Sequence, residues 1–302
     1  MSKPLDRLTL LESFVRISDR GSISAAARDL GLSQASASRQ LKELETRLGT
    51  QLIRRTTHSL ALTQSGQALL RDARELLAGW ENLQERHSEG DQAVRGPLKV
   101  VAPVALGQLQ LADIALDFQL RYPQISLTWE LEDQPIRFAE VGCDCWIKVG
   151  PVPDDTLIVR ELGRVERMLV ASPGLVGARS FAKPDEVAGL PFAALTAFEG
   201  ARIPLTSSRG RRHELKPRVA IATNNIFALQ RAALKGVGVA VLPRWFVQKD
   251  LDEGRLLDLL PKWRAARLTI NAAFLPARRQ PQRLSLFLAA LARGVESIPG
   301  IE

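Results

Sequence analysis

The sequence has few of the residues that build disulfide frameworks, metal centres or histidine-based active sites. Its 302 residues include two cysteines, Cys143 and Cys145, and three histidines, His58, His87 and His213. Two thiols exclude a disulfide framework, and three scattered histidines disfavour a zinc site. The sequence also offers no set of nucleophile, base and orienting residue, so it predicts no catalytic site, no metal site and no cofactor.

Long apolar segments are missing as well. No stretch approaches the roughly 18 consecutive apolar residues of a membrane span, and charged residues interrupt the N-terminal segment too often for a signal peptide. We therefore expect a cytoplasmic protein with no membrane partner. The net charge of +8 hints at a polyanion without saying which one. A length of 302 residues indicates two or three compact units.

Apolar spacing predicts three short helices near the N-terminus. Leu10, Phe14 and Ile17 recur at helical spacing before Gly21, which suits a helix end. Ser22 can cap a short second helix, which Gly31-Leu32-Ser33 interrupts. From Ser33, a third amphipathic helix carries one apolar face, formed by Ala37, Leu41, Leu44 and Leu48.

Two helices joined by a three-residue turn can place the second helix in the DNA major groove. Arginine donates a fork of hydrogen bonds to guanine, and glutamine can donate and accept opposite adenine. The groove candidates are Ser33 as cap with Gln34, Ser36, Ser38, Arg39 and Lys42. A small hairpin with a basic tip follows Gly49 and suits phosphates; its candidates are Arg54, Arg55, Thr57 and His58. The alternative is a helical bundle whose charged face is merely solvated.

Residues 22–66, SISAAARDLGLSQASASRQLKELETRLGTQLIRRTTHSLALTQSG, closely resemble the winged helix-turn-helix of LysR-type transcriptional regulators. They carry the family elements Ala-Ala-x-x-Leu, Ser-Gln-x-x-x-Ser-x-x-Leu, Leu-Glu-x-x-Leu-Gly and Leu-Thr-x-x-Gly at the family spacing. Ala35 departs from the pattern, because many members have proline there. The resemblance implies a DNA-binding domain over residues 1–62, double-stranded promoter DNA as partner, and RNA polymerase as a possible further partner.

Residues 63–91 form the predicted connector. Its apolar positions alternate in steps of four and three, which is typical of a heptad seam; they are Leu69, Ala73, Leu76, Trp80, Leu83 and His87. The pattern predicts a linker helix through which two copies dimerise. Acidic residues outnumber basic ones here, so we expect that this helix does not bind DNA. The alternative is an amphipathic helix packed on its own chain.

Residues 92–302 form the third predicted region, after a polar stretch that ends in Gly96-Pro97. A strand at 98–102, a helix at 107–121 and a strand at 125–131 predict an α/β domain with a parallel sheet. Further strands are expected in CWIKV, TLIVREL, RMLVAS, residues 193–196, RVAIA and VGVAVLP.

This region resembles the effector-binding domain of the same family, itself similar to periplasmic solute-binding proteins. The likeness is carried by 96–100, 150–154, 161–163, 171–173 and 232–243. It implies a two-lobed α/β domain, with one lobe at about 96–164 and 267–302, the other at about 165–266, and a small-molecule effector between them. It also implies a homodimer, often assembled into a homotetramer. The complete fold is therefore mixed: a winged helix-turn-helix that is mainly α, a long linker helix and the two-lobed domain.

Open α/β sheets bind ligands beyond the carboxyl ends of their strands, which places an effector in the same cleft. The candidate contacts are Pro103, Val104 and Ala105 after the first strand, and Thr196, Phe198, Thr223 and Asn224 from the other lobe. Many family members have serine or threonine at the first of these loops for an effector carboxylate. Its replacement by apolar residues favours a more apolar effector. For Thr223 alone, helix capping is favoured over a ligand contact, because threonine is a good cap residue.

Two other features of the sequence favour a structural role over a functional one. Cys143 and Cys145 fall on one face of a predicted strand, where buried free thiols are favoured over redox or metal sensing. The basic stretch Arg202–Arg218 favours a solvated hairpin over a DNA contact. A solute-binding protein for transport would explain the α/β cleft but not the N-terminal region. An enzyme would need the catalytic set that we do not find.

Overall fold

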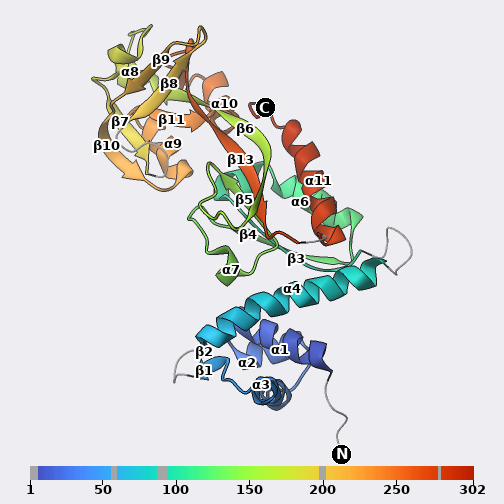
Figure 1. Cartoon of the computed structure of the whole chain (residues 1–302). Helices are drawn as coiled ribbons and strands as arrows, with labels where there is room; N and C mark the ends of the chain where they lie inside the picture. Colours follow the sequence, from blue (N-terminus) through green and yellow to red (C-terminus); the bar gives the residue numbers. More distant parts are fainter. Residues whose placement is uncertain (1–5, 56–59, 87–93, 197–201, 278–279) are drawn as a thin grey trace, which may run out of the picture. The chain divides into compact units, whose positions relative to one another are not determined.

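The computed structural model describes residues 6–55, 60–86, 94–196, 202–277 and 280–302 (Figure 1). The chain divides into two compact units. The first consists of Met1–Gly96, Ile136–Cys143 and Pro276–Ser285, and the second of Pro97–Pro135, Asp144–Leu275 and Leu286–Glu302. Among the described residues, no helix is both long and apolar enough to cross a membrane.

Three helices and a hairpin form the N-terminal part of the first unit (Figure 1). They are α1 (Arg7–Arg20), α2 (Ile23–Asp29), α3 (Gln34–Leu48), β1 (Ile53–Arg55) and β2 (Leu60–Leu62). As the sequence predicts, α1 ends at Gly21 with a positive φ of 57°, and the Ser22 hydroxyl caps α2 by accepting from the Ala25 amide. Phe14, Ala26 and Ala37 are fully buried in one shared core, which fixes the three helices against one another.

Helix α4 (Gln64–Arg86) follows the hairpin, and its two halves differ in burial. Near its start, Leu70 and Ala73 are buried, and Arg74 forms an ion pair of 2.5 Å with Asp19 of α1. Further along, the predicted seam positions Leu76, Trp80 and Leu83 are 52%, 41% and 39% exposed. The last seam position, His87, lies outside the described residues. Among the described residues, packing on its own chain is therefore seen for the first half of this helix.

The second unit is built on a mixed sheet. In the described residues its strands follow the order β11, β6, β13, β5, β3, β4, with β12 beside β6 and the β8–β9 hairpin beside β13. Their bounds are β3 Gly96–Ala102, β4 Ile125–Leu131, β5 Cys145–Val149, β6 Ile158–Ala171, β8 Ile203–Ser207, β9 Arg212–Leu215, β11 Ala240–Pro243, β12 Leu257–Asp258 and β13 Trp263–Phe274. A parallel pair joins β7 (Pro191–Leu195) to β10 (Arg218–Thr223).

The expectation of a parallel sheet is wrong for most of this unit. β3 and β5 run parallel, but β13 runs antiparallel to both β5 and β6, and β6 runs antiparallel to β11. The two predicted strands TLIVREL and RMLVAS are one continuous strand, β6, which pairs with β13 from Ile158 to Arg167. The register of β13 on β6 runs from Phe274 to Ala265, so these two long strands pair along most of their length.

The predicted helix at 107–121 is two helices, α5 (Val104–Leu109) and α6 (Ala112–Arg121). The break buries Leu111 completely between them. α5 packs closely on the sheet, since a Cβ at Gly107 would lie 2.6 Å from the Leu131 side chain. The remaining helices are α7 (Phe138–Val141), α8 (Pro173–Val176), the 3-10 turn Pro184–Val187, α9 (Ile226–Leu234), α10 (Arg244–Asp252) and α11 (Gln282–Glu296).

The structure also places the two cysteines and the basic stretch. Cys143 and Cys145 are both buried, as the sequence predicts. The basic stretch forms the β8–β9 hairpin, in which Arg202 pairs with Glu214 at 2.6 Å while Arg209 and Arg211 are exposed.

Candidate functional site

The outward face of α3 carries exposed hydrogen-bonding groups. Gln34, Arg39 and Lys42 are exposed, and Ser36 and Ser38 are partly so. Among the described residues, neither Arg39 nor Lys42 has an acidic partner. The Ser33 hydroxyl accepts from the Ser36 amide at 3.1 Å, so it caps the helix start. This face therefore presents two cations, Arg39 and Lys42, without an acidic partner in the described part of the chain.

Buried polar contacts fix this helix in place. The Ser13 hydroxyl of α1 donates to Oε1 of Gln40, and both side chains are buried. Glu45 accepts from the amides of Leu52 and Ile53 at 2.8 and 3.3 Å, which ties the start of the hairpin to α3. Sequence reasoning missed these residues, although Glu45 lies within the recognised Leu-Glu-x-x-Leu-Gly element.

The β1–β2 hairpin is called the wing below. Its strands pair antiparallel, with Arg54 exposed opposite Ala61. Arg54 has no acidic partner in the described part of the chain. The side chain of Arg55, and Thr57 and His58, lie outside the described residues.

The base of the wing is fastened to α4. The Thr63 amide donates to the Leu52 carbonyl at 2.9 Å, and its hydroxyl accepts from the Gly66 amide at 3.0 Å. A Cβ at Gly66 would overlap the Leu52 carbonyl oxygen, so this close approach requires glycine. The exposed cation of the wing is thus held in a fixed relation to the donors of α3, an arrangement that suits phosphates beside base edges.

A cleft of about 450 Å³ lies in the second unit. Of the predicted ligand contacts, Pro103, Ala105, Thr196 and Asn224 line it. Phe198 lies outside the described residues. The residues that the sequence did not single out include Glu132, Asp133, Trp146, Lys148, Arg167 and Trp245. Its volume is in the range of small-molecule sites.

Asp133 occupies the N-terminal end of α5. One carboxylate oxygen accepts from the Val104 amide at 2.9 Å, so the backbone donor of Val104 is satisfied within the protein. Burial in the cleft raises the pKa of Asp133, the Val104 hydrogen bond opposes this, and the neighbouring Glu132 adds to the rise. The chain's own carboxylate therefore sits where the family resemblance would place that of a ligand.

The cleft also holds polar groups without protein partners. Lys148 is half-buried on β5, and its ammonium lies 5.5 Å from the centre of the Trp146 ring. The ammonium has no hydrogen bond or ion pair to any described residue. Burial lowers its pKa. The indole nitrogen of Trp245 is likewise buried and lacks an acceptor within the described ranges. The buried Arg167, by contrast, donates to the Ala266 carbonyl.

The start of α9 corrects one expectation. Asn225, not Thr223, is the N-cap, because its side chain accepts from the amides of Phe227 and Ala228 at 3.1 Å. Thr223 accepts from the Asn225 amide at 3.1 Å, so it supports the cap, and it is absent from the described cleft lining. Asn224, between them, is exposed and lines the cleft.

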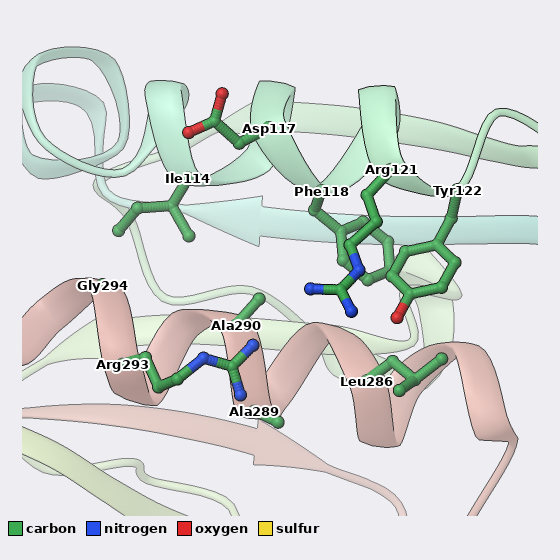
Figure 2. Close-up of a pocket in the computed structure, with 10 residues that line it drawn as sticks. All are labelled: Ile114, Asp117, Phe118, Arg121, Tyr122, Leu286, Ala289, Ala290, Arg293 and Gly294. Carbon is green, nitrogen blue, oxygen red and sulfur yellow. The ribbon is translucent and has the colours of Figure 1, made fainter. Parts of the chain in front are cut away.

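A second hollow of about 460 Å³ lies between α6 and α11 (Figure 2). Small residues on α11, Ala289 and Ala290, leave the space open. Arg121 and Arg293 extend their guanidinium groups into it, whereas Asp117 points away (Figure 2). Neither arginine has an acidic partner among the described residues. The described part of the chain contains no group of three or more His, Cys, Asp or Glu side chains placed to hold a metal ion.

Comparisons with known proteins agree with this architecture. A model described as the LysR substrate binding domain matches residues 91–296, and one described as the bacterial regulatory helix-turn-helix protein, lysR family, matches residues 8–67. The HTH-type transcriptional regulator PtxR of Pseudomonas aeruginosa is 29% identical over 299 residues, covering 96% of this chain and 95% of that protein. YhjC of Escherichia coli is 28% identical over 292 residues, covering 95% and 97%.

Two solved structures extend the comparison. CrgA, a LysR-type transcriptional regulator from Neisseria meningitidis, has a TM-score of 0.57 at 26% identity, covering 96% of this chain and 99% of that one. ArgP from Mycobacterium tuberculosis has a TM-score of 0.65 at 17% identity, covering 97% and 98%, and supports the fold alone.

Proposed function

The chain belongs to the LysR family of DNA-binding transcriptional regulators, and we propose that the outward face of α3 reads its operator while the wing grips phosphates. The residues assigned to the major groove are Gln34, Ser36, Ser38, Arg39 and Lys42, with Ser33 as cap. Arg54 and Arg55, with Thr57 and His58 at the tip, are assigned to the backbone. Family members regulate transcription and are not enzymes.

One observation carries the DNA assignment. The three exposed donors of α3 face away from a core that fixes the helix, and the cations among them have no acidic partner in the described residues. Unpaired arginine on a preorganised helix can form its two hydrogen bonds to guanine without first breaking an ion pair. An exposed Arg54 on a separate hairpin suits the sequence-independent share of binding.

We assign dimerisation to the second half of α4. Leu76, Trp80 and Leu83 are exposed at heptad spacing, and a second copy of the same helix would bury them. Assembly of dimers into a tetramer needs a further apolar surface. Leu116 and Leu120 on α6 provide a candidate, because they are 60% and 79% exposed one helical turn apart.

We assign the cleft of the second unit to a small-molecule effector, with contacts from Pro103, Ala105, Thr196 and Asn224. Effector binding would change how a dimer holds two half-sites. We place the protein in the cytoplasm, where DNA and RNA polymerase, its further proposed partner, are accessible.

Footprinting of the region upstream of its own gene and the adjacent divergent gene tests this function. The full-length protein should protect a pseudo-palindrome whose half-sites are separated by whole helical turns. The Arg39→Ala variant should lose that protection at protein concentrations where an Arg211→Ala control retains it. Equal protection by both variants would contradict the assignment of α3 to the groove.

A further inference from the structure

Lys148 is a charged group in the cleft whose ammonium forms no ion pair with a described residue. It is half-buried, and its contact within the cleft is the face of Trp146 at 5.5 Å. Burying an ammonium group without an acidic partner costs free energy, and the lowered pKa of this lysine expresses that cost. A ligand carrying negative charge would supply the missing partner.

Two carboxylates in the same cleft, those of Asp133 and Glu132, repel such a ligand. Asp133 already accepts the Val104 amide at the start of α5, and Glu132 lies beside it. A ligand carboxylate placed there would meet one or two carboxylates of the protein. Like charges a few ångströms apart disfavour each other by about 1 to 4 kcal/mol at a protein surface. The anionic part of a ligand is therefore directed away from α5.

A neutral donor complements the lysine. The buried indole nitrogen of Trp245, which lines the same cleft, has no acceptor among the described residues. A buried donor without an acceptor costs about 1 to 3 kcal/mol. A ligand oxygen that displaces the atoms covering this nitrogen would satisfy it. The faces of Trp146 and Trp245, with Ile226 and Leu268, offer an apolar wall for the rest of the molecule.

From this arrangement we infer that the effector is a small anion with an apolar body, whose acidic group pairs with Lys148 and whose apolar part packs between Trp146 and Trp245. The inference rests on the proposed role of the cleft as the effector site. The inference changes the expectation of a more apolar effector that was drawn from Pro103, Val104 and Ala105. These residues remove the carboxylate contact at the start of α5, but Lys148 on β5 offers another contact for an acidic group.

Two matched pairs of probes test the inference on the full-length protein: benzoate with benzamide, and hexanoate with hexanamide. Each pair differs in charge and little in size. Isothermal titration should give a dissociation constant about tenfold lower for the acid than for its amide, equivalent to about 1.4 kcal/mol. Lys148→Met should reduce that ratio to about one, and Lys148→Arg should retain it.

Arg293→Met is the matched control. It removes an unpaired cation from the other hollow, between α6 and α11 (Figure 2), so the acid-to-amide ratio should stay at its wild-type value. Thermal unfolding checks that Lys148→Met folds; its Tm should equal or exceed that of the wild type, because the cation has no acidic partner to lose among the described residues.

Three results would overturn the inference: equal binding of acid and amide by the wild type, an unchanged ratio in Lys148→Met, or no measurable binding of either acid. A ratio that falls in Arg293→Met instead would place the anion in the other hollow. Operator affinity is measured on the same preparations. If the wild type binds its operator but does not prefer the acid to the amide, the anionic effector alone is rejected. If the wild type does not bind its operator, the proposed function is rejected.

Discussion

Glu45 links the recognition helix to the wing, so its replacement tests how the two DNA contacts are coordinated. Its carboxylate accepts from the amides of Leu52 and Ile53 at 2.8 and 3.3 Å. These residues are 0% and 4% exposed, so water cannot readily replace the lost acceptor. Glu45→Ala should therefore leave two backbone donors unsatisfied at the base of the wing.

The size of the effect follows from these distances. The shorter bond to a charged acceptor is worth about 1.5 to 3 kcal/mol, and the longer one about 0.5 to 1 kcal/mol. Local opening of the wing should become easier by about 2 to 4 kcal/mol, which corresponds to hydrogen exchange of both amides about 30-fold to several hundred-fold faster.

Hydrogen exchange followed by mass spectrometry on the full-length protein measures this directly, with residues of α11 as the internal reference. Glu45→Gln keeps one acceptor oxygen and should show a smaller acceleration. DNA affinity of Glu45→Ala should fall on all sequences alike, because the wing contacts phosphates. Unchanged exchange at Leu52 and Ile53 would refute the role given to Glu45.

Three further outcomes are expected. Trp80→Glu combined with Leu83→Glu should convert dimers to monomers in analytical ultracentrifugation, since two charges would enter an apolar seam; an unchanged sedimentation coefficient would reject α4 as the dimer contact. Replacing Arg209, Arg211 and Arg212 by Gln should leave operator affinity nearly unchanged, and a several-fold loss with a shallower salt dependence would assign that hairpin to DNA. Because burial lowers the pKa of Lys148, affinity for benzoate should decline as pH rises through a pKa below the ordinary lysine value of 10.5, while affinity for benzamide stays flat; parallel curves for the two probes would contradict the charge pairing.

Local signals predicted the N-terminal helices well. Gly21, Ser22 and Ser33 act at the helix ends where the sequence indicates, because caps and left-handed glycines depend on neighbouring residues alone. The bonds of Glu45 and Gln40 join segments 7 to 27 residues apart. No local sequence pattern predicts such pairing. The signal that could have pointed to Glu45 is its place in the family element Leu-Glu-x-x-Leu-Gly.

The second unit was harder to predict for the same reason. Parallel and antiparallel strands have similar composition when both faces are covered, so the direction of β13 against β5 and β6 could not be read from its residues. The candidate contacts at Pro103, Ala105, Thr196 and Asn224 followed from the rule about strand ends. That rule did not identify Lys148 and Asp133, because their importance depends on which charged groups the fold brings near them.

The central claim is that the outward face of α3 reads base sequence while the wing contributes affinity on any DNA. Fluorescence anisotropy with the operator, single-base variants of it and unrelated DNA compares Arg39→Ala with Arg54→Ala. Arg39→Ala should lose about 1 to 3 kcal/mol on the operator and stop discriminating at one base position, whereas Arg54→Ala should weaken all sequences equally. An Arg39→Ala protein with unchanged affinity and unchanged sequence preference would contradict the claim.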